Sequence, residues 1–241
     1  MGAAAMVFGR TRLFLLLGVA LVFLGGCQTT HYFKSERLGR PDENRRILLM
    51  PVDVELSELS AAGSPKPHAA WTRQATEHID KALRDFFGQR QTELTHYKSG
   101  PKDDDLTSTR VQLVKLHGVV GGTAMTHQLV PAYRLPNKEN NFDWTLGPAV
   151  QELKREYGAD YALFMRIRDS YATGERVAFI IAAALLGVAV PGGQQIGFAT
   201  LVDLEDGDIV WFNFLFRDHG DLRTYKPAEE TVKALFTQFP K

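Results

Sequence analysis

Cysteine is almost absent from this chain, because Cys27 is the only one among 241 residues. A single thiol cannot form an internal disulfide, and it excludes zinc and iron–sulfur sites that need several cysteine ligands. An excess of charge of one sign is also missing, since 28 basic residues balance 28 acidic residues. Proteins that bind nucleic acid meet phosphate with a basic surface, so this balance argues against a nucleic-acid partner.

Catalytic and metal-binding motifs are missing as well. The seven histidines form no His-Glu-x-x-His pair, and the sequence has neither a glycine-rich phosphate loop nor a Gly-x-Ser-x-Gly turn. The three aspartates at positions 103–105 lack the alternating oxygen ligands and the glycine bend of a calcium loop. We therefore expect a protein that is not an enzyme and has no metal site and no cofactor.

The first hydrophobic run is too short to span a bilayer, which takes about 20 residues. It covers fifteen uncharged residues, 13–27, and follows two basic residues, Arg10 and Arg12. A basic start, a short apolar stretch and small residues at its end are typical of a secretory signal peptide. We assign residues 1–26 to such a signal.

The end of this run, Leu24-Gly25-Gly26-Cys27, resembles the lipobox of bacterial lipoproteins. The resemblance implies that the thiol of Cys27 is diacylated, that the signal is cut before it, and that the new amino terminus is acylated. Several acyl chains anchor a protein firmly, since each buried methylene contributes about 0.8 kcal/mol and one chain binds marginally. Gln28 stands where aspartate tends to retain the family in the inner membrane, which implies an outer-membrane anchor and a periplasm-facing chain.

The residues that follow the anchor are mostly polar. We expect residues 27–46 to form a flexible tether between the lipid and the folded domain. Tyr32, Phe33 and Leu38 leave open the alternative that this segment holds an ordered first element. Residues 47–241 would then form a periplasmic α/β domain.

Hydrophobic patterning predicts the first elements of this domain. The apolar run at 47–52 predicts a buried strand that ends or bulges at Pro51, because proline cannot donate to a sheet ladder. Apolar residues at helical spacing predict a helix from Trp71 to about Gly88, with Thr72 as N-cap. We expect a loop at 57–70, a short strand at 92–97 and a helix near 106–118 that glycines kink or end.

The second half of the domain shows alternation and turn signals. A helix is expected from Pro148 to Gly158, and side chains alternate along residues 160–170 as in a strand. An Asp-Gly turn joins strands at 195–204 and 208–216 into a hairpin, and Pro227 begins the last helix. We therefore expect a single α/β domain with a mixed sheet of about five strands flanked by helices.

Residues 177–190 have no polar side chain. As a helix this segment would extend about 21 Å, too short to span a bilayer, and being apolar all round it favours burial. Three alternatives are open: burial within the domain, which we expect first, contact with a partner or second copy, and insertion into a membrane. Its place between a strand and a hairpin, where a short link would suffice, favours a dedicated interface. The candidate partner-binding residues are Phe179, Ile180, Leu185, Leu186 and Trp211.

Two motifs resemble a group of uncharacterised bacterial outer-membrane lipoproteins. They are Asp160-Tyr161-Ala162-Leu163-Phe164, and Leu201-Val202-Asp203-Leu204 with Gly207 and Trp211. This group looks related to the amino-terminal domain of TolB and to the curli secretion lipoprotein. The resemblance covers residues 47–239 by element order and 160–211 by motif, and it implies an α/β domain that docks with envelope proteins. The curli lipoprotein crosses the membrane with strand hairpins, but residues 177–190 do not alternate, so that property is not carried over.

From these observations we expect a lipid-anchored binding or scaffold component of an envelope complex. Its partners would be the membrane, through the lipid anchor, and envelope proteins or further copies of itself, with no nucleic acid. One alternative is a periplasmic hydrolase, because a site assembled from distant loops leaves no motif. A second alternative is a self-assembling, membrane-associated oligomer built through residues 177–190.

Overall fold

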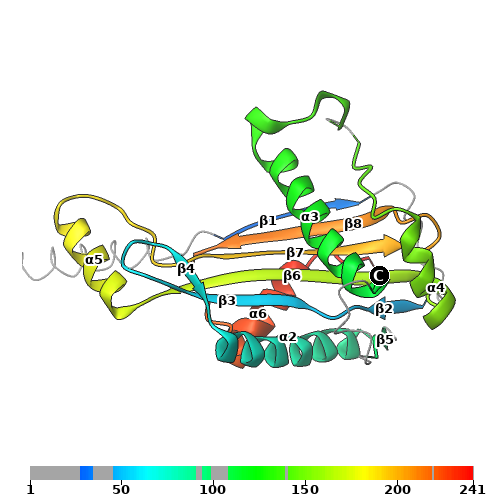
Figure 1. The fold of residues 1–241 in the computed structure, drawn as a ribbon, viewed down its shortest axis with the longest axis horizontal. Helices are drawn as coiled ribbons and strands as arrows, with labels where there is room; N and C mark the ends of the chain where they lie inside the picture. Colours follow the sequence, from blue (N-terminus) through cyan, green and yellow to red (C-terminus); the bar gives the residue numbers. More distant parts are fainter. Residues whose placement is uncertain are drawn as a thin grey trace, which may run out of the picture.

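The computed structural model describes residues 28–34, 46–90, 94–98, 108–138, 141–218 and 220–240. The expected signal peptide, the lipidation candidate Cys27 and residues 35–45 of the expected tether lie outside the described residues. The described residues fold as one mixed α/β domain around a single sheet (Figure 1).

The sheet has the strand order β1-β8-β7-β6-β2-β5, with β3 paired to β6 and β4 paired to β3. Strand β6 is its centre, because it pairs in parallel with β2 and β3 and antiparallel with β7. The mixed sheet and the β7–β8 hairpin confirm the sequence-based expectation, although the strands number eight rather than about five. Their bounds are β1 Gln28–Lys34, β2 Ile47–Leu49, β3 Asp53–Leu59, β4 Pro65–Pro67, β5 Leu94–His96, β6 Tyr161–Ala172, β7 Gln195–Asp203 and β8 Ile209–Arg217.

Pro51 accounts for the separation of β2 from β3. Leu49 pairs with Leu163 and Asp53 pairs with Arg166, so one extra residue lies on the β2–β3 side of the ladder. This is the bulge expected at a proline, which has no N–H to donate. The loop expected at 57–70 is wrong in part, because β3 continues to Leu59 and turns back into β4.

The expected tether does not hold for Gln28–Lys34, which form strand β1. This strand pairs antiparallel with β8 over its whole length, from Gln28 opposite Arg217 to Lys34 opposite Trp211. Without β1, strand β8 would present a row of unpaired N–H and C=O groups at the edge of the sheet. The alternative of an ordered first element is therefore the correct one for these seven residues.

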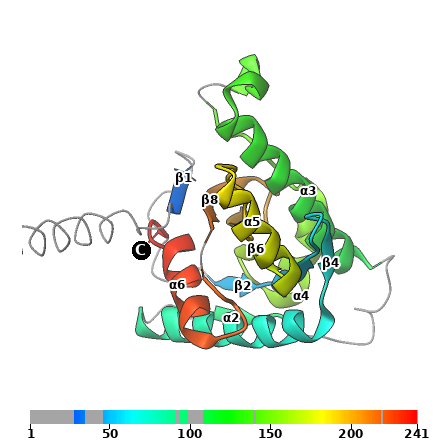
Figure 2. The same cartoon turned by 90° about the vertical axis from the view of Figure 1, so that its left-hand side faces the viewer.

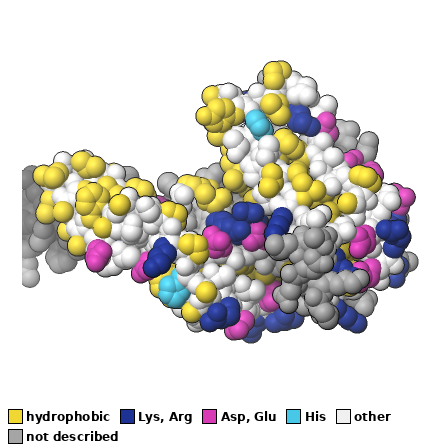
Figure 3. Space-filling view, in the orientation of Figure 1, with side chains coloured by type: hydrophobic (Ala, Val, Ile, Leu, Met, Phe, Trp, Pro, Cys, Tyr) yellow, Lys and Arg dark blue, Asp and Glu magenta, His cyan; other side chains and the backbone are white. Residues whose placement is uncertain are grey.

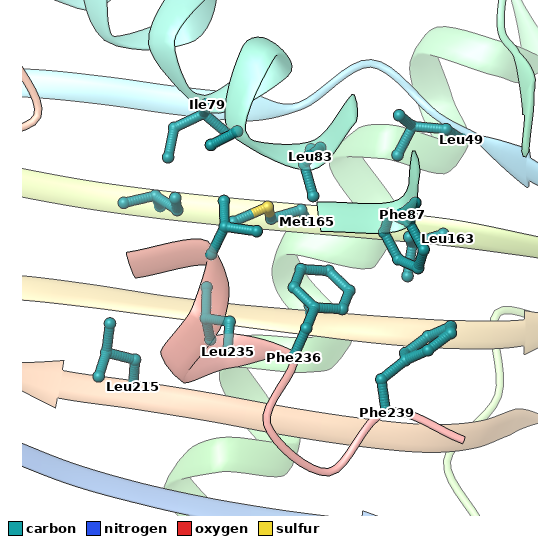
Figure 4. Close-up of a cluster of buried hydrophobic side chains, with 14 of the residues drawn as sticks. Leu49, Ile79, Leu83, Phe87, Leu163, Met165, Leu215, Leu235, Phe236 and Phe239 are labelled. Atoms are coloured by element: carbon teal, nitrogen blue, oxygen red, sulfur yellow. The ribbon is translucent and has the colours of Figure 1, made fainter. Parts of the chain in front are cut away.

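Helices cover both faces of the sheet (Figure 2). α2 (Ala69–Gln89) and α6 (Tyr225–Leu235) pack on one face, where Phe236 and Phe239 meet Phe87 (Figure 4). α3 (Thr109–Leu129) and α4 (Gln151–Tyr157) pack on the other face. Three short 3₁₀ turns lie between α3 and α4, namely Pro131–Tyr133, Pro136–Lys138 and Pro148–Val150. α5 (Gly174–Leu185) covers neither face and extends from one end of the sheet (Figure 1).

The predicted helices exist, but several of their ends differ. His68, not Thr72, caps α2, since its Nδ1 accepts a hydrogen bond from the Trp71 N–H at 3.3 Å. Thr72 instead accepts from the Leu56 N–H with its Oγ1, and Gly88 lies inside the helix. α3 continues beyond Gly118 to Leu129, and Gly118 and Gly121 lie where Arg166 and Phe198 leave no room for a Cβ.

Candidate interaction surface

Exposed large hydrophobic side chains gather on two projecting parts of the described residues. Five lie on α3 and the turn after it, six lie on α5 and the residues after it, and Phe216 of β8 is the remaining one. Such gathering marks surfaces that another molecule covers. The five are Leu116, Val119, Leu129, Val130 and Tyr133, and the six are Val177, Phe179, Ile181, Leu185, Leu186 and Val188.

The first surface is the segment from residue 173 to residue 194, which we call the α5 arm. It leaves the sheet where β6 ends and returns where β7 begins (Figure 1). Thr173 caps α5 by accepting a hydrogen bond from the Arg176 N–H at 3.1 Å. The helix ends in a Schellman turn, in which Gly187 has φ 76° and the Val188 N–H donates to Ala183 O at 2.9 Å.

Only one narrow face of α5 contacts the rest of the protein. Arg176, Ile180 and Ala183 are its buried or half-buried residues, and they follow one another at spacings of four and three. The remaining side chains face solvent, most of all Leu185 and Leu186, which are 84% and 82% exposed. Burial within the domain, the first expectation for this segment, is therefore wrong, because the arm extends past the sheet that would have to cover it. Figure 3 shows the apolar side chains that cover this projection.

A buried arginine braces the arm. The guanidinium of Arg176 donates to Ala61 O at 3.2 Å and to Pro191 O at 2.9 Å. The first carbonyl belongs to the turn between β3 and β4, and the second belongs to the segment that returns from α5. Gly63 leaves room for this contact, since a Cβ there would lie 2.9 Å from the guanidinium. The arm is thus fixed at its base and free at its tip.

A buried polar network lies at the root of the arm. Asp169 of β6 accepts from the Tyr171 hydroxyl at 2.6 Å, from the Gln195 amide at 2.7 Å and from the Ser170 N–H at 2.8 Å. Arg217 joins the network by donating to Gln195 Oε1 at 2.7 Å. Burial outweighs these donors and raises the pKa of Asp169 to about 6. The network fixes the ends of β6, β7 and β8 side by side.

The second surface is a cleft of about 630 Å³ between α3 and the bulge at Pro51. Its walls are apolar, with Val52, Val111, Val114 and the exposed Val119 among them. Its charged lining is mainly cationic: Arg110, Lys115, Arg166, Arg168 and one acid, Asp53. Cavities with apolar walls and a few convergent polar groups are typical of binding sites.

Ion pairs fix three of these cations. Asp53 accepts from Arg168 at 2.7 Å and lies 3.2 Å from Arg166. Arg166 also passes directly beneath α3, where a Cβ at Gly118 would lie 2.0 Å from its guanidinium. Arg110 pairs with Glu156 of α4. His117, next to these residues, is fully buried, and burial together with the Arg166 charge lowers its pKa to about 3.

The structure brings together four of the five predicted partner-binding residues. Phe179, Leu185 and Leu186 are exposed on the arm, and Ile180 lies half-buried on its inner side beside Gly192. Trp211 is a correction, because it is fully buried and its indole N–H donates to Gln238 O at 3.0 Å. Aromatic content alone could not separate a core strand from a contact surface.

The sequence did not predict three features of these surfaces: the cleft, Arg176 and Asp169. The cleft depends on α3 crossing the β2–β3 bulge, a contact between distant segments that leaves no local pattern. Arg176 carried a weak signal, since it is the last charged residue before fourteen apolar ones. Asp169 carried none. Among the described residues no three His, Cys, Asp or Glu side chains gather as a metal site would require, and no described helix is both long enough and apolar enough to cross a bilayer.

No protein-family model matches the chain, and neither does any curated protein. Among solved structures, a PelC dodecamer from Paraburkholderia phytofirmans is 12% identical with a TM-score of 0.38, covering 88% of this chain and 96% of that one. The C-terminal domain of LpoB from Salmonella enterica is 15% identical with a TM-score of 0.27, covering 70% and 79%. A lipoprotein from Neisseria meningitidis is 13% identical with a TM-score of 0.33, covering 80% and 94%. At these values the likenesses carry no argument about activity or partners.

Proposed function

We propose that this chain is a lipid-anchored lipoprotein of the bacterial outer membrane that faces the periplasm and serves, without catalysis, as a binding and assembly component of an envelope complex. One observation carries the proposal: the exposed apolar side chains are concentrated on two projecting helices, α3 and α5. The lipobox-like sequence that ends at Cys27 supports the anchor.

Two separate apolar surfaces suit a protein that holds other components together. Each exposed apolar patch is unfavourable in water unless another molecule covers it, and a domain with two such patches can contact two molecules at once. The α5 arm lies at one end of the sheet, whereas α3 stands over one of its faces (Figure 1). A single occupant of moderate size would leave one of them uncovered.

The cleft beside α3 indicates the chemistry of a protein partner. Its walls would cover apolar side chains, and Lys115 on the exposed side of α3 adds an unburied positive charge to the rim. A segment with apolar residues flanked by aspartate or glutamate fits such a cleft, because complementary charge steers association and fixes register. We therefore expect an envelope protein that presents an acidic, apolar segment.

Site-specific photocrosslinking in intact cells tests this surface. A photoreactive residue at Val119, which is 66% exposed beside the cleft, should give a discrete protein adduct. The matched control is Glu77, an exposed position on α2 on the opposite face of the sheet, which should give none. Lys115→Glu should weaken the adduct at 119 by charge repulsion. Equal labelling at both positions, or an adduct at 119 made only of two copies of this chain, would overturn the proposal.

Mass spectrometry of the chain purified from its native membrane tests the anchor separately. The expected mature chain begins at Cys27 and carries acyl groups on that residue. A bare thiol on a chain that retains residues 1–26 would overturn the lipid anchor and, with it, the proposed outer-membrane location.

A further inference from the structure

The α5 arm and Gln28, the residue that follows the proposed lipid anchor, lie at the same end of the sheet. Gln28 of β1 pairs with Arg217 of β8, Arg217 pairs with Gln195 of β7, and Gln195 pairs with Asp169 of β6. These four residues form one row across four strands. Asp169 is near the end of β6, and the chain enters the arm four residues later, at Thr173.

Simple geometry brings the anchor close to the arm. Neighbouring strands lie about 4.8 Å apart, so three steps across the row separate Gln28 from Asp169 by about 14 Å. Cys27 precedes Gln28 directly, and consecutive Cα atoms are about 3.8 Å apart. The twelve residues of α5 form a helix about 18 Å long. Gln28, the residue directly after the proposed lipid-bearing Cys27, therefore lies within one helix length of the base of the arm.

The chemistry of the arm matches hydrocarbon better than a protein surface. Protein interfaces combine an apolar centre with a polar rim. By contrast, residues 177–190 offer no polar side chain at all, and exposure is greatest at the tip, at Leu185 and Leu186. A twelve-residue helix is too short to cross a bilayer, which leaves shallow insertion into one leaflet.

We propose that the tip of the α5 arm inserts into the same membrane leaflet that holds the acyl chains of Cys27. The inference rests on the lipid anchor of the proposed function and names the lipid leaflet as the occupant of the α5 arm. Two attachment points would fix the orientation of the domain at the membrane, whereas a single lipid would leave it free to rotate. The brace at Arg176 transmits this constraint, because it ties the arm to the β3–β4 turn.

A depth measurement on the full lipoprotein tests the insertion. Since Cys27 is the only native cysteine and acylation blocks its thiol, a cysteine introduced elsewhere is the only one that reacts with a fluorophore. The protein carrying Leu185→Cys, labelled with an environment-sensitive fluorophore, is reconstituted into phosphatidylcholine vesicles that contain brominated lipid. The expected result is a blue-shifted emission, quenched by the brominated chains and protected from aqueous iodide. Raised salt should not change it, because residues 177–190 carry no charge.

Glu77→Cys on α2 provides the matched control and should remain open to iodide. Equal iodide quenching at 185 and 77 would overturn the inference. Protection from iodide without quenching by brominated lipid, together with a doubled mass in detergent, would overturn it in favour of a second copy of the chain.

A variant without the anchor separates this inference from the proposed function. In a chain that starts at Gln28, and so lacks both the signal and the acylated cysteine, the arm is the remaining proposed membrane contact, and adding Leu185→Asp and Leu186→Asp should lower the vesicle partition coefficient about a hundredfold. The same two changes at Leu116 and Val119 of α3 should leave it unchanged. An acylated Cys27 with a water-exposed position 185 would refute the insertion alone, whereas a bare Cys27 with a lipid-quenched position 185 would refute the anchor alone.

Discussion

The side-chain carboxyl of Asp169 is buried, and this burial makes the stability of the fold depend on pH. Its pKa lies at about 6 in the folded protein, against 3.8 for an ordinary aspartate. A raised folded-state pKa means that the folded protein binds the proton more tightly than the unfolded chain. The stabilising contribution is therefore complete below about pH 4 and is lost as the pH rises through 6. The shift corresponds to about 3 kcal/mol.

The pH dependence of urea unfolding for wild type and Asp169→Asn tests this prediction. The difference in unfolding free energy between the two proteins should change by about 2 kcal/mol between pH 4 and pH 7, which is most of the full effect. His117 also makes the unfolding free energy depend on pH, because its lowered pKa destabilises the fold as the pH falls below 6.5. This contribution is the same in both proteins, so it cancels when their unfolding free energies are subtracted. Glu77→Gln, an exposed change, serves as the control. A constant difference across this range would contradict a raised pKa at Asp169.

Two neighbouring glycines of α3 should respond in opposite ways to the same substitution. A Cβ at Gly121 would lie 2.2 Å from the ring of Phe198, whereas a Cβ at Gly122 meets nothing within 4 Å. Alanine favours a helix over glycine by about 1 kcal/mol, but overpacking a core costs about 1–3 kcal/mol. Gly121→Ala should therefore lower the unfolding free energy by about 1 kcal/mol, and Gly122→Ala should raise it by up to about 1 kcal/mol. Urea denaturation measures both, and a raised unfolding free energy for Gly121→Ala as well as Gly122→Ala would show that α3 does not lie this close to the sheet.

At the scale of elements, the hydrogen bonds of Arg176 should stabilise the arm against local unfolding, while the rest of the domain should not depend on them. Replacing it with alanine removes two hydrogen bonds from a buried cation, together worth about 2 kcal/mol. Hydrogen exchange of residues 174–190 should accelerate about thirtyfold, while β6 and β7 keep their protection. The adjacent, exposed Glu175→Ala is the control and should leave exchange close to that of wild type. Uniform acceleration over the whole sheet would mean that Arg176 stabilises the domain as a whole.

Local patterns predicted the elements whose own side chains determine them. The alternation along β6 and the Asp-Gly turn of the β7–β8 hairpin are confirmed, because each depends on neighbours in the sequence. The length of α3 was missed, because Gly118 and Gly121 indicate a helix end by local propensity, whereas in the fold they make room for Arg166 and Phe198. β1 was only the second alternative for its segment, because its pairing partner, β8, lies about 180 residues away along the chain and a mostly polar segment does not identify such a partner.

The site was less predictable than the fold for a related reason. Composition identified residues 177–190 as apolar but could not say whether the domain would cover them. That outcome depends on where the sheet ends relative to the helix, which is a property of the whole topology. The same property decided Trp211, which the pairing of β8 with β7 and the packing of α6 place in the core.

At the scale of the whole molecule, the α5 arm should be dispensable for folding. Among the residues of the arm, only Arg176 and Ala183 are buried. The sheet and the helices that pack on it supply nearly all of the core. The strands on either side already meet, because the Ser170 N–H donates to Gln194 O at 3.1 Å. Replacing residues 173–191 with Asn-Gly should close β6 and β7 into a tight hairpin.

The shortened chain should keep its unfolding free energy within about 1 kcal/mol of wild type, because the transition loses little buried apolar area. It should also need less detergent to stay monodisperse, since six exposed hydrophobic side chains leave with the arm. Urea unfolding and sedimentation in decreasing detergent measure the two effects. Loss of the folded state would show that the arm is part of the structural core. A stable, more soluble domain would show that the sequence retains fourteen apolar residues for contact with another molecule rather than for folding, which is the premise that both proposals share.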